Sequence, residues 1–222
     1  MRPILQISNK NNTSQHIAIL IAERMDLIVL EIGLSDLNNI NTLIEEKDAA
    51  LLVIGLNSNK EIQFYLNKCR ELRVPYIFVN NDIPANFDIK NIILPITNLE
   101  EDREKGPFSS SFARHFNCPI TIYQPNDYGS KAETNIEAMK NLFNSLNLQY
   151  STQKGKKDSN GIELESAILN KNNQNSILII SASRDYGLDD IIFGPKERKI
   201  IKNTNLPTML INPRGDLYAL CD

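Results

Sequence analysis

Residues 176–181 read SILIIS, and residues 194–201 read GPKERKII. The first stretch is a short apolar run rich in β-branched residues, a pattern typical of a strand that is covered on both faces. The second stretch carries Gly194 and Pro195 directly before an amphipathic segment, and this order favours the start of a helix. A buried strand that leads through a loop into a helix is the repeating unit of a parallel sheet.

The same alternation of apolar runs and amphipathic stretches continues along the whole chain. Strands are expected at residues 4–7, 27–32, 49–55, 74–79, 91–96, 119–123, 149–153, 176–181 and 206–211. Helices are expected at residues 13–25, 34–47, 61–73, 98–116 with a kink at 106–107, 130–146, 161–169 and 195–202. Thr13 or Ser14 is expected to cap the first helix, and Leu146 is expected to face the core. The pattern predicts an α/β fold with Rossmann-like parallel sheets and helices on both faces.

Two pairs of strands repeat within the chain. Residues 4–8 (ILQIS) resemble residues 93–97 (ILPIT), and residues 74–79 (VPYIFV) resemble residues 206–211 (LPTMLI). We interpret this as an internal duplication with a trimmed first copy.

The duplication predicts two α/β subdomains, each with its own parallel sheet. The first is a shortened domain at residues 1–80, the linker covers residues 81–89, and the second domain covers residues 90–222. Residues 81–86 (NDIPAN) are rich in turn formers, which is typical of a linker. The final strands of the two copies are expected to lie together across a pseudo-twofold interface, since pairing protects an apolar edge.

Composition excludes several classes of function. The net charge is −3, with 24 basic and 27 acidic residues, so the basic excess of a nucleic-acid-binding protein is missing. No apolar run approaches the roughly 20 residues that span a bilayer, and the N-terminus lacks the layout of a signal peptide, so we expect no membrane contact and a cytoplasmic location. Three widely spaced cysteines suit a reducing compartment.

Motifs that carry catalysis or bind metals are missing from the sequence. His16 and His115 are the only histidines and stand far apart, so a zinc site is not expected. The sequence contains no G-x-S-x-G elbow, no P-loop and no strand-linked G-x-G-x-x-G. No residue is therefore assigned a catalytic role.

Residues 90–213 resemble a universal stress protein domain. Three features carry the resemblance: NIILPITNLEED at residues 91–102, SILIISASRDYGLDDIIFGPKERKII at residues 176–201 and TNLPTMLINP at residues 204–213. They are similar to the family's opening strand, to its fourth strand with the glycine loop and helix, and to its closing strand. Residues 1–80 resemble a shortened copy, so the chain looks like a tandem member of the family.

The resemblance also implies where a nucleotide would bind. Nucleotide-binding members carry G-x2-G-x9-G-(S/T), whose glycines let backbone amides approach phosphates at a helix start. Aligned on Gly194, the earlier glycine positions hold Ser181 and Arg184, and Pro195 stands at the hydroxyl position. Thr97 stands where the family has an acid at the end of the opening strand.

A residual nucleotide or anion site would gather near the carboxyl ends of the strands. Its members would be Thr97, Ser181, Arg184, Gly194 and Lys196. Arg184 and Lys196 could supply contacts to phosphate in place of the lost glycines. A helix start at Gly194 and Pro195 is equally common in proteins that bind no ligand.

Three functions remain open. The first is a non-enzymatic stress-response or regulatory protein without a cofactor, with weak or no ATP binding, that acts through protein contacts. The alternative is a universal stress protein that binds ATP or AMP with slow or no hydrolysis. An enzyme on the same architecture is the least favoured. Partners would be unidentified proteins, a second copy of the chain, or the other half of the same chain in an intramolecular pseudo-dimer.

Overall fold

The computed structural model describes residues 1–8, 11–84, 86–127, 131–183 and 195–214. Its first half alternates strands and helices from β1 to β4. The elements are β1 (Pro3–Ile7), α1 (Asn12–Met25), β2 (Ile28–Ile32), the 3-10 helix η1 (Leu34–Asn39), α2 (Ile40–Lys47), β3 (Leu51–Leu56), α3 (Ile62–Cys69) and β4 (Tyr76–Asn80).

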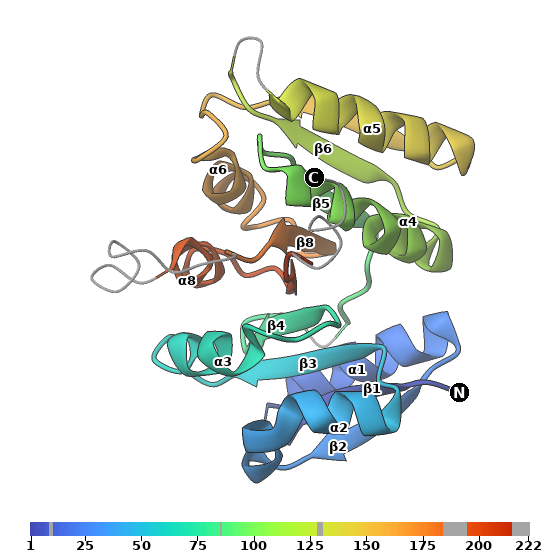
Figure 1. The fold of residues 1–222 in the computed structure, drawn as a ribbon, viewed down its shortest axis with the longest axis vertical. Coiled ribbons are helices and arrows are strands. Elements are labelled where there is room, and N and C mark those ends of the chain that lie inside the picture. The colour runs from blue at the N-terminus through green and yellow to red at the C-terminus, as the bar shows by residue number, and fades with distance from the viewer. Residues whose placement is uncertain (9–10, 85, 128–130, 184–194, 215–222) are drawn as a thin grey trace.

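The second half begins again with a strand and continues the alternation to the end of the described chain (Figure 1). The elements are β5 (Asn91–Pro95), the 3-10 helix η2 (Glu100–Glu104), α4 (Lys105–Phe116), β6 (Ile120–Gln124), α5 (Lys131–Ser145), β7 (Tyr150–Lys154), α6 (Ile162–Leu169), β8 (Ser176–Ser181), α8 (Lys196–Lys202) and β9 (Thr208–Ile211). The α/β class and the positions of all nine strands are as the sequence predicts.

The nine strands form one sheet in the order β2-β1-β3-β4-β9-β8-β5-β6-β7. Neighbouring strands are parallel within each half, and β4 pairs antiparallel with β9 through Ile77 opposite Met209. The expected meeting of the two final strands is confirmed, but the expectation of two separate sheets is wrong. The reason is that β4 and β9 pair edge to edge through backbone hydrogen bonds, and this pairing joins the two parallel sheets into one.

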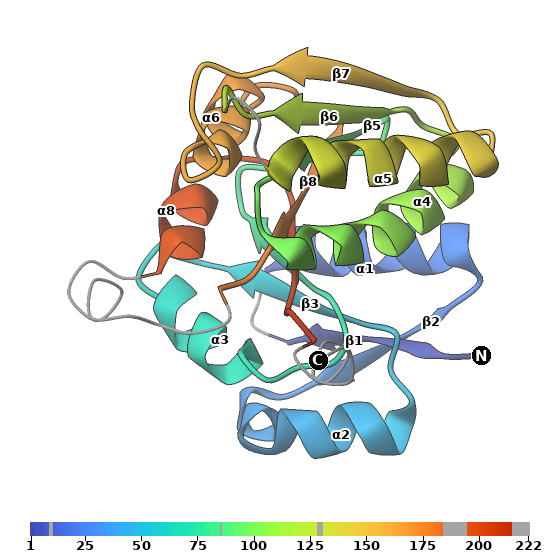
Figure 2. The same cartoon turned by 45° about the horizontal axis from the view of Figure 1, so that its top comes forward.

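Helices cover both faces of the sheet (Figure 2). One apolar cluster lies under α1, α4 and α5, and the other lies under α2, α3, α6 and α8. Each cluster contains residues from both halves, for example Ile21 with Ile136 and Leu66 with Ile200. The division into independent domains at residues 81–89 stays a prediction, but the buried core is shared between the two halves.

Among the described residues, the first half has one strand fewer than the second. Its order, β2-β1-β3-β4, repeats the order β6-β5-β8-β9, and its described residues form no counterpart of the edge strand β7. This arrangement agrees with the trimmed first copy that the sequence indicates.

Two local predictions are wrong. The N-cap of α1 is Asn11, whose side chain accepts a hydrogen bond from the backbone N–H of Ser14 at 2.9 Å. Asn11 reaches this position because Gly55 lies against it: a Cβ on Gly55 would be 2.5 Å from the Asn11 Cβ. Leu146 is 39% exposed because α5 ends at Ser145, so Leu146 leaves the buried stripe of the helix. Ser130, which the sequence predicts to open the helix at 130–146 in a capping box with Glu133, lies outside the described residues.

In the described part of the chain, no helix is long and apolar enough to cross a membrane. The same residues contain no group of three or more histidine, cysteine or acidic side chains that could hold a metal ion.

The shared core predicts that the two halves unfold together. Met209 is fully buried on β9, so Met209→Ala should lower the free energy of unfolding by about 2–5 kcal/mol. Urea unfolding gives this value, and hydrogen exchange should speed up in β1 as well as in β8. Leu34→Ala, at a side chain that is 52% exposed, serves as the control and should change stability by less than about 0.5 kcal/mol. Faster exchange confined to the second half would show that the halves are independent.

Candidate functional site

The strand order reverses at the carboxyl ends of β5 and β8, the position where an open α/β sheet ordinarily has its ligand-binding crevice. These strands are parallel neighbours, and the chain leaves β5 toward β6 on one side and returns to β8 on the other. In open α/β sheets, ligands bind beyond the strand ends at such a reversal. The candidate site therefore lies beyond Pro95 and Ser181.

A buried ion pair occupies this crevice. Asp102 on η2 and Lys105 at the start of α4 are three residues apart, so their side chains share one helix face. The Lys105 Nζ is 2.9 Å from the Asp102 Oδ1, and both side chains are 0% exposed. The Lys105 ammonium also donates a hydrogen bond to the carbonyl oxygen of Pro95 at 2.6 Å. A positive charge of the protein itself thus lies at the end of β5.

Asp102 joins the ends of the two central strands. Its Oδ2 accepts a hydrogen bond from the backbone N–H of Thr97, and its Oδ1 accepts one from the hydroxyl of Ser181 at 2.8 Å. Burial alone would raise the pKa of Asp102. The charge of Lys105 and the hydrogen bonds from Thr97, Lys105 and Ser181 outweigh burial and hold the pKa below its usual value. Asp102 is therefore ionised, and both of its carboxylate oxygens accept hydrogen bonds.

Glu163, at the start of α6, links this pair to α8. Its Oε2 is 3.0 Å from the Nζ of Lys196, and its Oε1 is 3.9 Å from the Nζ of Lys105. Burial would lower the pKa of Lys196, but the nearby carboxylates, first of all Glu163, raise it above its usual value. Lys196 is the member of the network closest to solvent, with 36% of its side chain exposed.

Glu197 completes the buried charges of the site. Its side chain is 1% exposed, and its Oε1 accepts a hydrogen bond from the backbone N–H of Ser183. Burial raises the pKa of Glu197 above its usual value, and the hydrogen bond from Ser183 and the charge of Lys196 only partly oppose this. The backbone that follows β8 is thereby held against α8.

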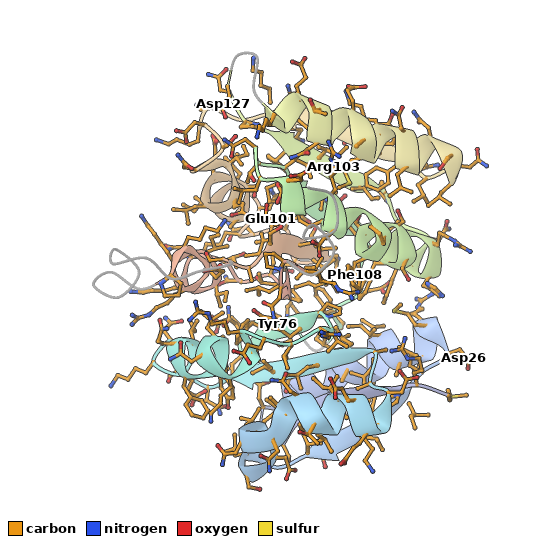
Figure 3. All side chains as sticks on the ribbon, in the orientation of Figure 1. Asp26, Tyr76, Glu101, Arg103, Phe108 and Asp127 are labelled. Atoms are coloured by element: carbon orange, nitrogen blue, oxygen red, sulfur yellow. The ribbon has the colours of Figure 1, made fainter. Side chains whose placement is uncertain are left out.

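The backbone that follows β5 is held by α5. Asn135 donates hydrogen bonds from Nδ2 to the carbonyl oxygens of Thr97, at 3.1 Å, and Leu99, at 2.7 Å. Arg103, labelled in Figure 3, donates from Nε to the Asn135 Oδ1 at 3.1 Å. The Thr97 hydroxyl accepts a hydrogen bond from the backbone N–H of Leu99 at 3.2 Å. The turn after β5 is therefore closed by the protein's own groups.

Three of the five sequence-predicted site residues meet in this network. Thr97 contributes its backbone N–H, Ser181 its hydroxyl and Lys196 its ammonium group. Arg184 and Gly194 lie outside the described residues. Whether these five residues hold a nucleotide or an anion stays a prediction.

Four buried residues of the network are not predicted from the sequence as site members: Asp102, Lys105, Glu163 and Glu197. The one available signal is the spacing of Asp102 and Lys105 within a helical turn. Such a pair at a helix start is normally solvated, so the spacing alone gives no reason to place it in the interior.

Comparison with solved structures identifies the architecture. A universal stress protein from Archaeoglobus fulgidus DSM 4304 superposes with a TM-score of 0.68 over 96% of this chain and 97% of that chain, at 9% identity. A functionally unknown protein from Pseudomonas aeruginosa PAO1 gives a TM-score of 0.58, with 98% and 84% of the two chains covered at 12% identity. A putative universal stress protein from Pseudomonas aeruginosa UCBPP-PA14 gives 0.57, with the same coverage and identity.

No protein-family model matches the chain, and no curated protein matches it either. The chain has the universal stress protein fold, so the sequence resemblance is confirmed at the level of the fold.

The buried pair predicts a pH-dependent stability defect. Lys105→Met keeps the length of the side chain but leaves Asp102 as a buried charge without its cation, which should cost about 3–5 kcal/mol at pH 7. In the variant, burial raises the pKa of Asp102, so the carboxyl takes up a proton as the pH falls and the penalty decreases. In the native protein the lowered pKa gives a stabilisation that is lost below about pH 4.

Urea unfolding of the native protein and the variant between about pH 7 and pH 4 measures this difference. Lys140→Met removes an exposed pair with Glu137 and is the control, with an expected loss below about 1 kcal/mol at every pH. A Lys105→Met penalty that stays constant over this range would contradict the assignment of Asp102 as the uncompensated charge.

Proposed function

We propose that this chain is a non-enzymatic regulatory protein on the universal stress protein fold that binds ATP weakly or not at all. The observation that carries the proposal is the position of Lys105. Its ammonium bonds to Asp102 and to the Pro95 carbonyl, inside the crevice where a ligand of an open α/β sheet would bind. A nucleotide could enter only by displacing contacts that satisfy buried charges, and an unpaired buried charge costs several kcal/mol.

The balance of charge supports weak binding of phosphate. The network contains three carboxyl groups, on Asp102, Glu163 and Glu197, against the two ammonium groups of Lys105 and Lys196. Even with Glu197 protonated, the two remaining carboxylates balance the two ammonium groups. Phosphate sites normally offer an excess of positive charge and several free backbone N–H groups. The N–H groups of Thr97 and Ser183 already donate to Asp102 and Glu197.

The chemistry of the hydroxyl groups supports a non-enzymatic role. A nucleophilic serine needs an adjacent base that accepts its proton. The Ser181 hydroxyl donates instead to Asp102, whose lowered pKa makes it a weak base. In the described part of the chain, neither His16 nor His115 forms a hydrogen bond with a site residue.

We infer that the protein acts through contacts with other proteins, in the cytoplasm. Cys69 and Cys118 are free, buried thiols, as expected in a reducing compartment. The antiparallel pair of β4 and β9 supports an intramolecular pseudo-dimer, because it joins equivalent strands of the two halves. A homodimer of the whole chain would have to use another surface.

One observation favours the alternative, in which the protein binds ATP or AMP. Lys196 opens α8 and keeps 36% of its side chain exposed, so an anion could approach its ammonium group. Under this alternative Lys196 would exchange its contact with Glu163 for a phosphate oxygen.

Calorimetric titration with ATP and magnesium tests the proposal. Each lost phosphate contact costs about 1.5–3 kcal/mol, so the dissociation constant should exceed about 10 μM, and 100 μM ATP should stabilise the fold by less than about 1.4 kcal/mol. GTP is the control for binding through charge alone. AMP tests the alternative function. A dissociation constant for ATP or AMP below about 10 μM that Lys196→Ala abolishes would establish the alternative instead.

A further inference from the structure

A cavity lies between α6 and α8, on the face of the sheet opposite α1, α4 and α5. Its volume is about 610 Å³, within the roughly 300–1,000 Å³ of small-molecule sites. Figure 1 shows the two helices side by side, and their residues are in contact. The cavity adjoins the buried network beyond β5 and β8, because Glu163 and Lys196 of that network line it.

The wall on the α6 side is apolar. It consists of Leu164, Ile168 and Leu169, and Ile200 of α8 faces them across the cavity. Ile168 and Leu169 are 52% and 64% exposed, which is unusual for two adjacent large aliphatic residues. An apolar wall with exposed aliphatic side chains fits a ligand with an apolar body.

The acidic groups at the cavity already interact with groups of the protein. Asp158 accepts a hydrogen bond from the backbone N–H of Gly161 at 3.1 Å. Glu165 accepts hydrogen bonds from the backbone N–H groups of Lys156 and Lys157, at 2.9–3.0 Å. Glu163 is paired with Lys196. These carboxylates therefore have little capacity left to attract a cationic ligand.

Two cations at the cavity remain available. Lys157 and Lys199 both line it and are exposed, and their ammonium groups form no ion pair within the described ranges. Lys196 is less suited to hold a ligand, because an anion would have to take it from the buried Glu163. Charge complementarity at this cavity thus favours a negative group placed near Lys199 or Lys157.

We propose that this cavity binds a small anionic amphiphile, namely a carboxylate on an unbranched aliphatic chain. The carboxylate binds Lys199 or Lys157, and the chain lies along Leu164, Ile168 and Leu169. The eight residues of α6 extend over about 12 Å, the length of a chain of roughly ten carbons. The inference does not rest on the proposed function, because it concerns a different class of ligand held by different side chains.

Calorimetric titration of the full chain with decanoate, below its micelle-forming concentration, tests the proposal. We expect saturable binding with a dissociation constant below about 100 μM. Decanol tests the need for the charge and decyltrimethylammonium tests its sign, and both should bind at least tenfold more weakly. Failure of decanoate to saturate by about 1 mM, or equal binding of the three compounds, would overturn the proposal.

Variants locate the site. Lys199→Glu and Lys157→Glu together should weaken decanoate binding at least tenfold, and Ile168→Asp should abolish it. The matched controls are Lys140→Glu and Leu146→Asp on the α5 side, which should leave the affinity unchanged. Lys157, Lys199, Ile168 and Leu146 are exposed and Lys140 is half-buried, so circular dichroism should show native folding of the variants. Unchanged affinity in the cavity variants would place the ligand elsewhere and refute the assignment.

Two further measurements distinguish binding in the cavity from binding to a membrane surface or to an ATP site. Sedimentation with phosphatidylglycerol vesicles should leave the protein in solution; binding to vesicles without binding of decanoate would show a membrane-surface site and overturn the proposal. Decanoate affinity should be the same with and without 1 mM ATP. Loss of decanoate binding in ATP would place both ligands in one site and refute the assignment to a separate cavity.

Discussion

The burial of one ammonium group, that of Lys105, sets the arrangement of the second half of the molecule. A charge that is fully removed from water must be paired and hydrogen-bonded. Asp102 and the Pro95 carbonyl meet this requirement directly, and Glu163 adds its charge from α6. Through these partners β5, β8, α4 and α6 converge on a single point. The crevice that an open α/β sheet keeps for a ligand is in this protein part of the core.

The first half fills its equivalent crevice by a different means. There the strand order reverses between β1 and β3, and Asn11 lies beyond the strand ends. Its Nδ2 donates to the carbonyl oxygens of Leu56, at 3.1 Å, and Val79, at 3.4 Å. A neutral amide suffices here because Gly55 lets the helix approach the sheet closely. The two halves thus share a topology but close their crevices with unrelated chemistry.

The sequence predicts the features of the fold that depend on local pattern and misses those that depend on distant contacts. Strands such as β8 are predicted with their bounds because apolar β-branched runs depend on local pattern, and the repeat of 74–79 in 206–211 predicts that β4 and β9 meet. The continuous sheet is not predicted, since the local strand pattern does not show that the hydrogen bonds of one half continue into the other half. Asp102 is missed for the same reason: its burial depends on Ser181, 79 residues away, and on Lys105 meeting Glu163.

The antiparallel pairing of β4 and β9 also limits which strand ends a single ligand can contact. Because β4 and β9 run in opposite directions, the carboxyl ends of the strands in the first half point to one side of the molecule. Those of the second half point to the opposite side. A single ligand therefore cannot contact both crevices, and in each crevice the protein's own side chains already bond the strand ends. The cavity is lined by side chains of α6 and α8 and by Lys157 from the loop between β7 and α6. A ligand in the proposed cavity would thus contact mainly helix side chains, whereas the fold ordinarily binds its ligands at the strand ends.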